Sequence, residues 1–237
     1  MEVTTCFKRY ELKYLLDAEQ YAAVREAMRG RMIPDAYGKS RVCNLYFDTP
    51  DFRIIRRSLE KPVYKEKLRL RSYGPVGADG TVFAELKKNY QSVVYKRRAT
   101  MTRDGAMEFF RAPDPHTQIE RELAYFLTVN PTAEPMIWLS YAREAFFGTN
   151  NPDFRMTFDT EVRARGDALT LGGGIYGAPV LPQGKVLMEV KVADAMPLWL
   201  TNTFSAAGIR PTSFSKYGTA YLQRQETGLL TGGQHYA

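Results

Sequence analysis

Four cationic side chains alternate with other residues in the stretch Tyr64–Tyr73, at Lys65, Lys67, Arg69 and Arg71. Successive side chains of a β-strand point to opposite faces, so a strand here would carry all four on one face, about 7 Å apart. Like charges at this spacing repel each other, and an anion bound to that face would offset the repulsion. Arginine and lysine bind phosphate oxygens with charge-assisted hydrogen bonds, which favours a phosphate ligand. The alternative is an ordinary surface strand whose charged face is solvated.

Similar alternation recurs along the chain and predicts about eight strands. They are expected at residues 7–16, 41–48, 64–73, 82–88, 93–100, 136–147, 154–163 and 186–192. Helices are expected near residues 17–30, 51–59, 117–128, 197–207 and 215–223. Asp17 and Gln20 resemble a capping box, and Ser215 fits an N-cap.

The helices and the strands together indicate the fold class. Helices with apolar stripes need an apolar sheet face to cover, and the charged sheet faces must then meet water or a ligand. An α+β fold, a closed eight-stranded antiparallel β tunnel with a charged interior and flanking helices, satisfies both conditions. The chain has no linker rich in Pro, Gly or Ser, so we expect residues 1–226 to form a single domain. Residues 227–237 are expected to be a flexible tail.

Composition sets limits on partners and location. Of the 237 residues, 44% are hydrophobic, which is enough for a packed core and excludes overall disorder. No apolar run approaches 18 residues, so direct membrane insertion is not expected. Two cysteines, Cys6 and Cys43, lack metal-type spacing and favour a reduced, cytoplasmic protein with buried thiols. The formal charge of +7 favours an anionic partner. Nucleic acid is not expected, because no basic patch is interleaved with exposed aromatics outside the strands.

Short motifs distributed over nearly the whole chain resemble the VTC domain. This is the catalytic domain of vacuolar transporter chaperone polyphosphate polymerases, within the CYTH or triphosphate tunnel metalloenzyme superfamily. The matching segments are Tyr10–Tyr14, Tyr46–Thr49, Leu68–Tyr73, Glu85–Lys87, Tyr95–Arg97, Tyr141–Phe146, Arg155–Thr160, Met188–Lys191 and Phe214–Tyr217. Each segment is short, and their order along the chain makes the resemblance specific.

The resemblance implies a set of site residues. Its phosphate ligands would be Lys13, Arg69, Arg71, Lys87, Lys96, Arg143, Arg155, Lys191, Ser215 and Lys216. Glu189 would bind a divalent metal, Mn²⁺ or Mg²⁺, with Asp159 and Glu161 nearby on the same face. Lys13, Arg69, Arg71, Arg143, Arg155 and Glu189 would be the catalytic residues. The alternative for each is an ordinary ion pair, for example between Glu189 and Lys191.

The resemblance implies a metal-dependent polyphosphate polymerase that transfers the γ-phosphate of ATP to a growing polyphosphate chain. An ionised phosphate acceptor needs no general base, and the chain has only two histidines, His116 and His235. Many CYTH hydrolases begin with Glu-x-Glu-x-Lys, whereas this chain reads Arg9-Tyr-Glu11-Leu-Lys13, which disfavours a two-metal hydrolase. A triphosphatase of the same fold and a non-catalytic polyphosphate-binding module remain the alternatives. The expected partners are ATP and polyphosphate or triphosphate. A membrane-protein partner outside this chain is also compatible with the sequence.

Overall fold

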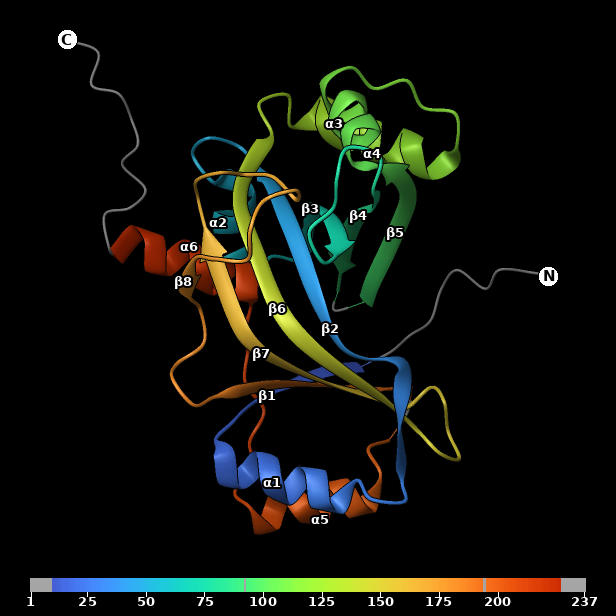
Figure 1. Ribbon diagram of the computed structural model, residues 1–237, viewed down its shortest axis with the longest axis vertical. Coiled ribbons are helices and arrows are strands. Elements are labelled where there is room, and N and C mark those ends of the chain that lie inside the picture. Colours follow the sequence, from blue (N-terminus) through green and yellow to red (C-terminus); the bar gives the residue numbers. More distant parts are fainter. Residues whose placement is uncertain (1–9, 92, 194, 227–237) are drawn as a thin grey trace. The chain divides into compact units, whose positions relative to one another are not determined.

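The computed structural model describes residues 10–91, 93–193 and 195–226 (Figure 1). The strands are β1 (Tyr10–Leu16), β2 (Met32–Asp48), β3 (Tyr64–Tyr73), β4 (Thr81–Tyr90), β5 (Val93–Thr102), β6 (Glu134–Gly148), β7 (Arg155–Arg165), β8 (Ala178–Pro179) and β9 (Val186–Val192). The helices are α1 (Ala18–Ala27), α2 (Arg53–Leu59), α3 (Arg103–Arg111), α4 (Gln118–Val129), α5 (Leu198–Ala206) and α6 (Lys216–Glu226). The predicted tail, residues 227–237, and Cys6 lie outside the described residues.

The strands form one sheet, in the order β1-β9-β7-β6-β2-β3-β4-β5, with β8 paired to β7. Every pairing for which a register is known is antiparallel. The predicted α+β class with a large antiparallel sheet and flanking helices is confirmed. Its closure is not: among the described strands no ladder joins β1 to β5, so the sheet is open. Alternation along a strand defines its faces but does not define which strands pair at the ends of the sheet.

The chain divides into two compact units, each built from three separate segments. The first contains residues 1–41, 141–162 and 181–214, and the second contains residues 42–140, 163–180 and 215–237. No helix in the described part of the chain is long and apolar enough to cross a membrane.

In the first unit, α1 and α5 cover one face of the sheet strands (Figure 1). Helix α1 begins at the predicted capping box, in which Asp17 accepts a hydrogen bond from the backbone N–H of Gln20. Val24 of α1 and Leu200 of α5 are fully buried. They pack with apolar side chains of β1, β7 and β9, including Tyr14, Met156 and Val190. This packing leaves the charged residues of the same strands on the opposite face.

In the second unit, α3 and α4 pack on the apolar face of β2, β3 and β4. Leu123 of α4 and Ala106 of α3 have no exposed surface, and they join Leu68 and Leu70 of β3 in one core. Helix α3 is not predicted from the sequence pattern. It begins at Thr102, whose hydroxyl accepts a hydrogen bond from the N–H of Gly105. The apolar face of β3 and β4 therefore packs against α3 and α4, and the charged face points away from this core.

Candidate functional site

Cationic side chains of β3, β4 and β5 occupy adjacent rows on the charged face of the second unit. Tyr46, Arg69, Glu85 and Arg98 lie directly opposite one another on consecutive strands. Residues paired in this way project to the same face with their Cβ atoms about 5 Å apart. The next row contains three lysines, Lys67, Lys87 and Lys96. Together with Arg71, the two rows place six cations and one carboxylate, Glu85, on the same face of β3, β4 and β5.

The single carboxylate, Glu85, is clamped by four of those cations. Oε2 of Glu85 lies 2.7 Å from Nη2 of Arg69 and 3.7 Å from Nη1 of Arg71. Oε1 lies 2.7 Å from Nζ of Lys96 and 2.8 Å from Nε of Arg98. Glu85 is 1% exposed, so burial alone would raise its pKa. Arg69, Arg71 and Lys96 outweigh burial and hold the pKa of Glu85 well below its usual range.

Lys96 is the member of this cluster whose charge can change near neutral pH. Burial lowers the pKa of Lys96 to about 7, although Glu85 opposes that shift, and Arg71 and Arg69 lower it further. Directly opposite Lys96 lies Lys87, and opposite Lys87 lies Lys67. Like charges in register destabilise a sheet. The lysine row therefore favours a bound anion.

Helix α6 is anchored to this unit by a buried tyrosine. The Tyr217 hydroxyl donates a hydrogen bond to Oδ2 of Asp48 over 2.8 Å, and its ring stacks on Tyr46 with centroids 4.4 Å apart. Tyr46 in turn accepts a hydrogen bond from Arg69 over 3.0 Å. Asp48 is fully buried and also accepts the N–H groups of residues 49, 54 and 55. These contacts hold the start of α6 in place, including the predicted ligands at positions 215 and 216.

Ser215 connects the start of α6 to the lysine row. Its hydroxyl accepts the N–H of Gly218 at 3.2 Å, as expected of an N-cap. The same hydroxyl lies 3.4 Å from Nζ of Lys67. Lys216 is the first residue of α6. The structure thus brings the predicted ligands of β3, β4, β5 and α6 to one region of the second unit.

In the first unit, the predicted residues of β1, β9 and β7 occupy two rows. Lys13, Glu189 and Thr157 lie opposite one another, and Glu11, Lys191 and Arg155 form the adjacent row. Nζ of Lys13 lies 3.2 Å from Oε1 of Glu11. Lysine, arginine and carboxylate therefore share this face, whereas the charged face of the second unit is almost entirely cationic.

Arg143 of β6 lies between two of the predicted metal ligands. Its guanidinium forms a bidentate pair with Asp159, with Nε–Oδ1 and Nη2–Oδ2 distances of 2.6 and 2.7 Å. Nη2 of Arg143 also lies 3.7 Å from Oε2 of Glu189. Asp159 is fully buried and Glu189 is 8% exposed. The positive charge of Arg143 therefore offsets much of the negative charge of Asp159 and Glu189, which a metal ion would need.

The side chains here could supply some of the ligands of a metal ion, but not a complete set. No group of three Asp, Glu, His or Cys side chains in the described ranges could hold a metal. Asp159 directs both oxygens to Arg143, which leaves Glu189 as the better-placed carboxylate. Opposite Glu189 on β7, the buried hydroxyl of Thr157 has no hydrogen-bond partner among the residues that the structure describes. Mg²⁺ commonly uses one or two carboxylates and takes its other ligands from phosphate and water, and this donor set fits that pattern.

Glu161 does not join Asp159 and Glu189. Its backbone φ is +50°, and this left-handed conformation interrupts the strand alternation that the sequence predicts through residue 163. Glu161 is exposed and pairs instead with Lys39 and with Arg41, a residue to which the sequence assigns no role. Its predicted role in metal binding is therefore not supported by its position.

The sequence underestimates the role of Glu85. The sequence shows Glu85 only as part of the Glu85–Lys87 motif, whereas in the structure its carboxylate contacts four cations. Arg98, absent from the predicted ligands, is one of those four. Its alternation with Lys96 along β5 is the signal that could have identified it. Tyr46 and Tyr217 lie within the motifs described above, but their stacking could not be read from the sequence.

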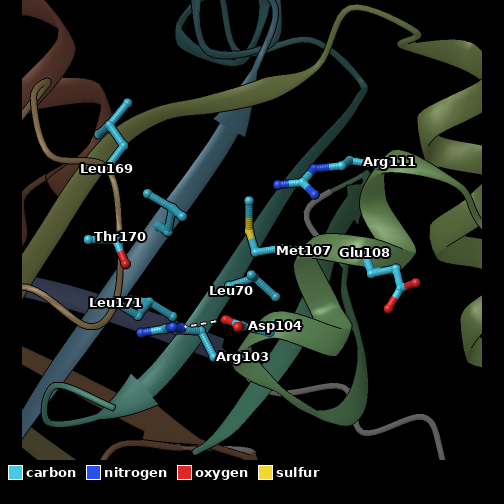
Figure 2. Close-up of a pocket in the computed structure, with 10 residues that line it drawn as sticks. Leu70, Arg103, Asp104, Met107, Glu108, Arg111, Leu169, Thr170 and Leu171 are labelled. Atoms are coloured by element: carbon cyan, nitrogen blue, oxygen red, sulfur yellow. Dashed lines mark hydrogen bonds and ion pairs between the residues drawn. The ribbon is translucent and has the colours of Figure 1, made fainter. Parts of the chain in front are cut away.

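A pocket of about 450 Å³ lies on the other, apolar side of β2 and β3 (Figure 2). Leu70, Met107 of α3 and Leu171 line it, and Arg103 at its edge pairs with Asp104 (Figure 2). Its lining includes two arginines and two acids, so it has no excess of positive charge. This pocket is therefore not part of the candidate phosphate site.

A solved structure shares this fold at low sequence identity. A candidate adenylate cyclase from Bacillus halodurans is 13% identical, with a TM-score of 0.55 over 88% of this chain and 95% of that chain. A candidate adenylate cyclase from Vibrio parahaemolyticus is also 13% identical, with a TM-score of 0.48 over 92% of this chain and 99% of that chain. At this identity the first likeness concerns the fold alone.

Sequence comparison identifies the family more directly. No curated protein matches the sequence. The family model of the VTC domain matches residues 8–224, which is nearly the whole chain and includes every predicted site residue. The chain therefore belongs to the VTC domain family.

Proposed function

We propose that this protein is a metal-dependent polyphosphate polymerase, which transfers the γ-phosphate of ATP to the end of a growing polyphosphate chain. The observation that carries the proposal is the charged face of β3, β4 and β5. Six cations there share one carboxylate, Glu85, which is itself held by four of them. A polyphosphate has repeated anionic oxygens that suit such an array, because each cation can contact a different phosphoryl group.

The chemistry of this transfer requires little from the protein beyond alignment and charge neutralisation. The acceptor oxygen of a polyphosphate end is already ionised at neutral pH, so no base has to remove a proton. In the proposal, Arg69, Arg71 and the lysine row bind phosphate oxygens, and Ser215 and Lys216 contribute from α6. Lys13, Arg143, Arg155 and Lys191 are further proposed cationic ligands, located in the first unit.

Mn²⁺ or Mg²⁺ is the proposed cofactor. When bound, it would neutralise charge that develops on the phosphoryl oxygens. Glu189 would hold it, and Asp159 would act mainly by keeping Arg143 beside Glu189. The hydroxyl of Thr157, opposite Glu189, is available to accept or donate one further hydrogen bond.

The ion pairs argue against a two-metal triphosphatase. Such an enzyme would need several acids free to bind metal, and Glu11, Glu85, Asp159 and Glu161 each pair with at least one cation instead. Removing Glu85 or Asp159 from its partners would leave largely buried cations, such as Arg71 and Arg143, without compensation. The polymerase proposal needs one acid, Glu189, whose contact with Arg143 is longer, at 3.7 Å.

The test is incubation of the purified protein with ATP and Mn²⁺. Polymer would be detected on a polyphosphate-stained gel while free phosphate is assayed in parallel. Glu189→Gln should make no ladder. The matched control is Glu144→Gln, which removes a carboxylate of the same unit that pairs with Arg25 and should leave the ladder intact.

Other outcomes identify the rival functions. Free phosphate without a ladder would replace the polymerase by a triphosphatase. Tight polyphosphate binding without either product, and equally tight binding by Glu189→Gln, would favour a non-catalytic binding module.

A further inference from the structure

A second basic pocket lies at the start of β3, beside α2 and the end of α4. It has a volume of about 210 Å³. Its cations are Arg53 and Arg57 of α2 and Lys65 of β3, and its apolar lining residues include Ile54 and Val129. None of the residues assigned to the candidate phosphate site lines it.

The two arginines are one helical turn apart and face the same pocket. Like charges at positions i and i+4 of a helix are destabilising unless something compensates them. Arg53 is held by Asn130, whose Oδ1 accepts a hydrogen bond from Nη2 over 3.0 Å. This bond orients the guanidinium but adds no negative charge. Arg57 is exposed, and no described residue pairs with it.

Glu66, the one acid of the pocket, is committed elsewhere. Its Oε2 accepts a hydrogen bond from the hydroxyl of Tyr64 over 2.7 Å. No ion pair joins Glu66 to either arginine within the described residues. The pocket therefore keeps an excess of positive charge, because its acid is turned toward a neutral donor. An anion with several oxygens could accept the arginine forks and the lysine together.

We propose that Arg53, Arg57 and Lys65 form a second phosphate-binding site, at the start of β3 next to the row of Lys67, Lys87 and Lys96. It takes a phosphoryl group, supplied either by free pyrophosphate or by the end of a polyphosphate chain. The pocket is small enough to select a terminal phosphoryl group.

The test follows the methyl signals of Ile54 and Val129 by NMR while pyrophosphate or a long polyphosphate is titrated into the full chain. We expect both signals to move. The double variant Arg53→Gln/Arg57→Gln should weaken binding at this pocket about tenfold or more, because two charge-assisted contacts are removed. The matched control is Arg56→Gln, a neighbouring arginine of α2 that pairs with Asp51 and does not line the pocket.

A variant that should tighten binding, instead of weakening it, provides a second test. Glu66→Gln keeps an acceptor for Tyr64 but removes the negative charge, so it should tighten binding several-fold. Movement with pyrophosphate identifies the free anion as a ligand, and movement with the long polymer alone identifies a chain end. Signals that stay still with both probes would overturn the proposal, as would equal losses in Arg56→Gln and the double variant. Because the readout is local binding, failure of the polymerase assay would leave this test intact.

Discussion

Nζ of Lys96 lies 2.7 Å from Oε1 of Glu85, and three arginines approach the same carboxylate. Arginine does not lose its proton in proteins. Of these four cations, only Lys96 can therefore lose its proton and so reduce the repulsion among them. Its pKa is lowered to about 7. The positive charge of the face formed by β3, β4 and β5 should consequently vary within the physiological pH range.

We predict that polyphosphate affinity rises as the pH is lowered from about 8 to about 6, because Lys96 becomes protonated in that interval. Isothermal titration calorimetry at each pH would measure this change. Lys96→Arg keeps the charge at every pH and should flatten the part of the profile that belongs to the protein. An identical profile in the wild type and in Lys96→Arg would assign the whole effect to the ligand's own titration.

The same shift predicts a change in stability. The pKa of Lys96 falls from its ordinary value of 10.5 to about 7 on folding, so the unfolded chain binds more protons between these values. The contribution of Lys96 to the free energy of unfolding should therefore increase as the pH rises through this window. Urea denaturation at pH 7 and pH 9 should show a smaller increase in Lys96→Met than in the wild type.

Replacing Arg143 by methionine should be strongly destabilising. It would leave Asp159, which is fully buried, without its bidentate partner. Breaking a buried ion pair from one side costs about 3–5 kcal/mol. Urea denaturation would measure this loss, and the double variant Arg143→Met/Asp159→Leu should recover most of it. If the double variant were no more stable than the single one, unpaired charge would not be the cause.

Tyr217→Phe should lower the free energy of unfolding by about 1.5–3 kcal/mol, the usual range for a hydrogen bond to a charged group. The substitution removes the donor to Asp48 and keeps the ring that stacks on Tyr46. Tyr125 is 69% exposed, so Tyr125→Phe is the control and should change stability by less than about 0.5 kcal/mol. Chemical denaturation of both variants tests the prediction, and equal effects would contradict it.

Gly177→Ala should destabilise the protein more than Gly184→Ala. Both glycines have positive φ, at +138° and +73°, so both substitutions strain the backbone. A Cβ at Gly177 would also lie 2.5 Å from the carbonyl oxygen of Ala164, whereas nothing lies within 4 Å at Gly184. The difference in thermal midpoint between the two variants measures the steric part. A smaller loss in Gly177→Ala would show that this segment can move away.

The strands were predictable where charged and apolar residues alternate without interruption. β3 and β9 begin and end where the pattern places them. The alternation also identified Arg69 and Arg71 as residues of one face, but it could not show that Glu85 on the next strand meets both. Contacts between strands depend on register, and no periodicity within a single strand encodes register.

The remaining misses have local causes. Glu161 departs from the pattern because a single left-handed backbone conformation rotates it out of the row, and its residue type gives no signal for that. Helix α3 escaped prediction because Gly105 in its first turn lowers helix propensity. Closure of the sheet was inferred from two-sided strands, which an open sheet also satisfies.

The pairing of β1 with β9 has a consequence for biosynthesis. Tyr10 lies opposite Val192 in the antiparallel ladder, and β9 is the strand next to β1 in the sheet order. A ribosome adding about 5–20 residues per second would need roughly 10–35 s between these two positions. During that time β1 lacks its partner strand, and its unpaired backbone is open to other nascent chains. Chaperone demand should therefore fall on β1 and end only when β9 has been synthesised.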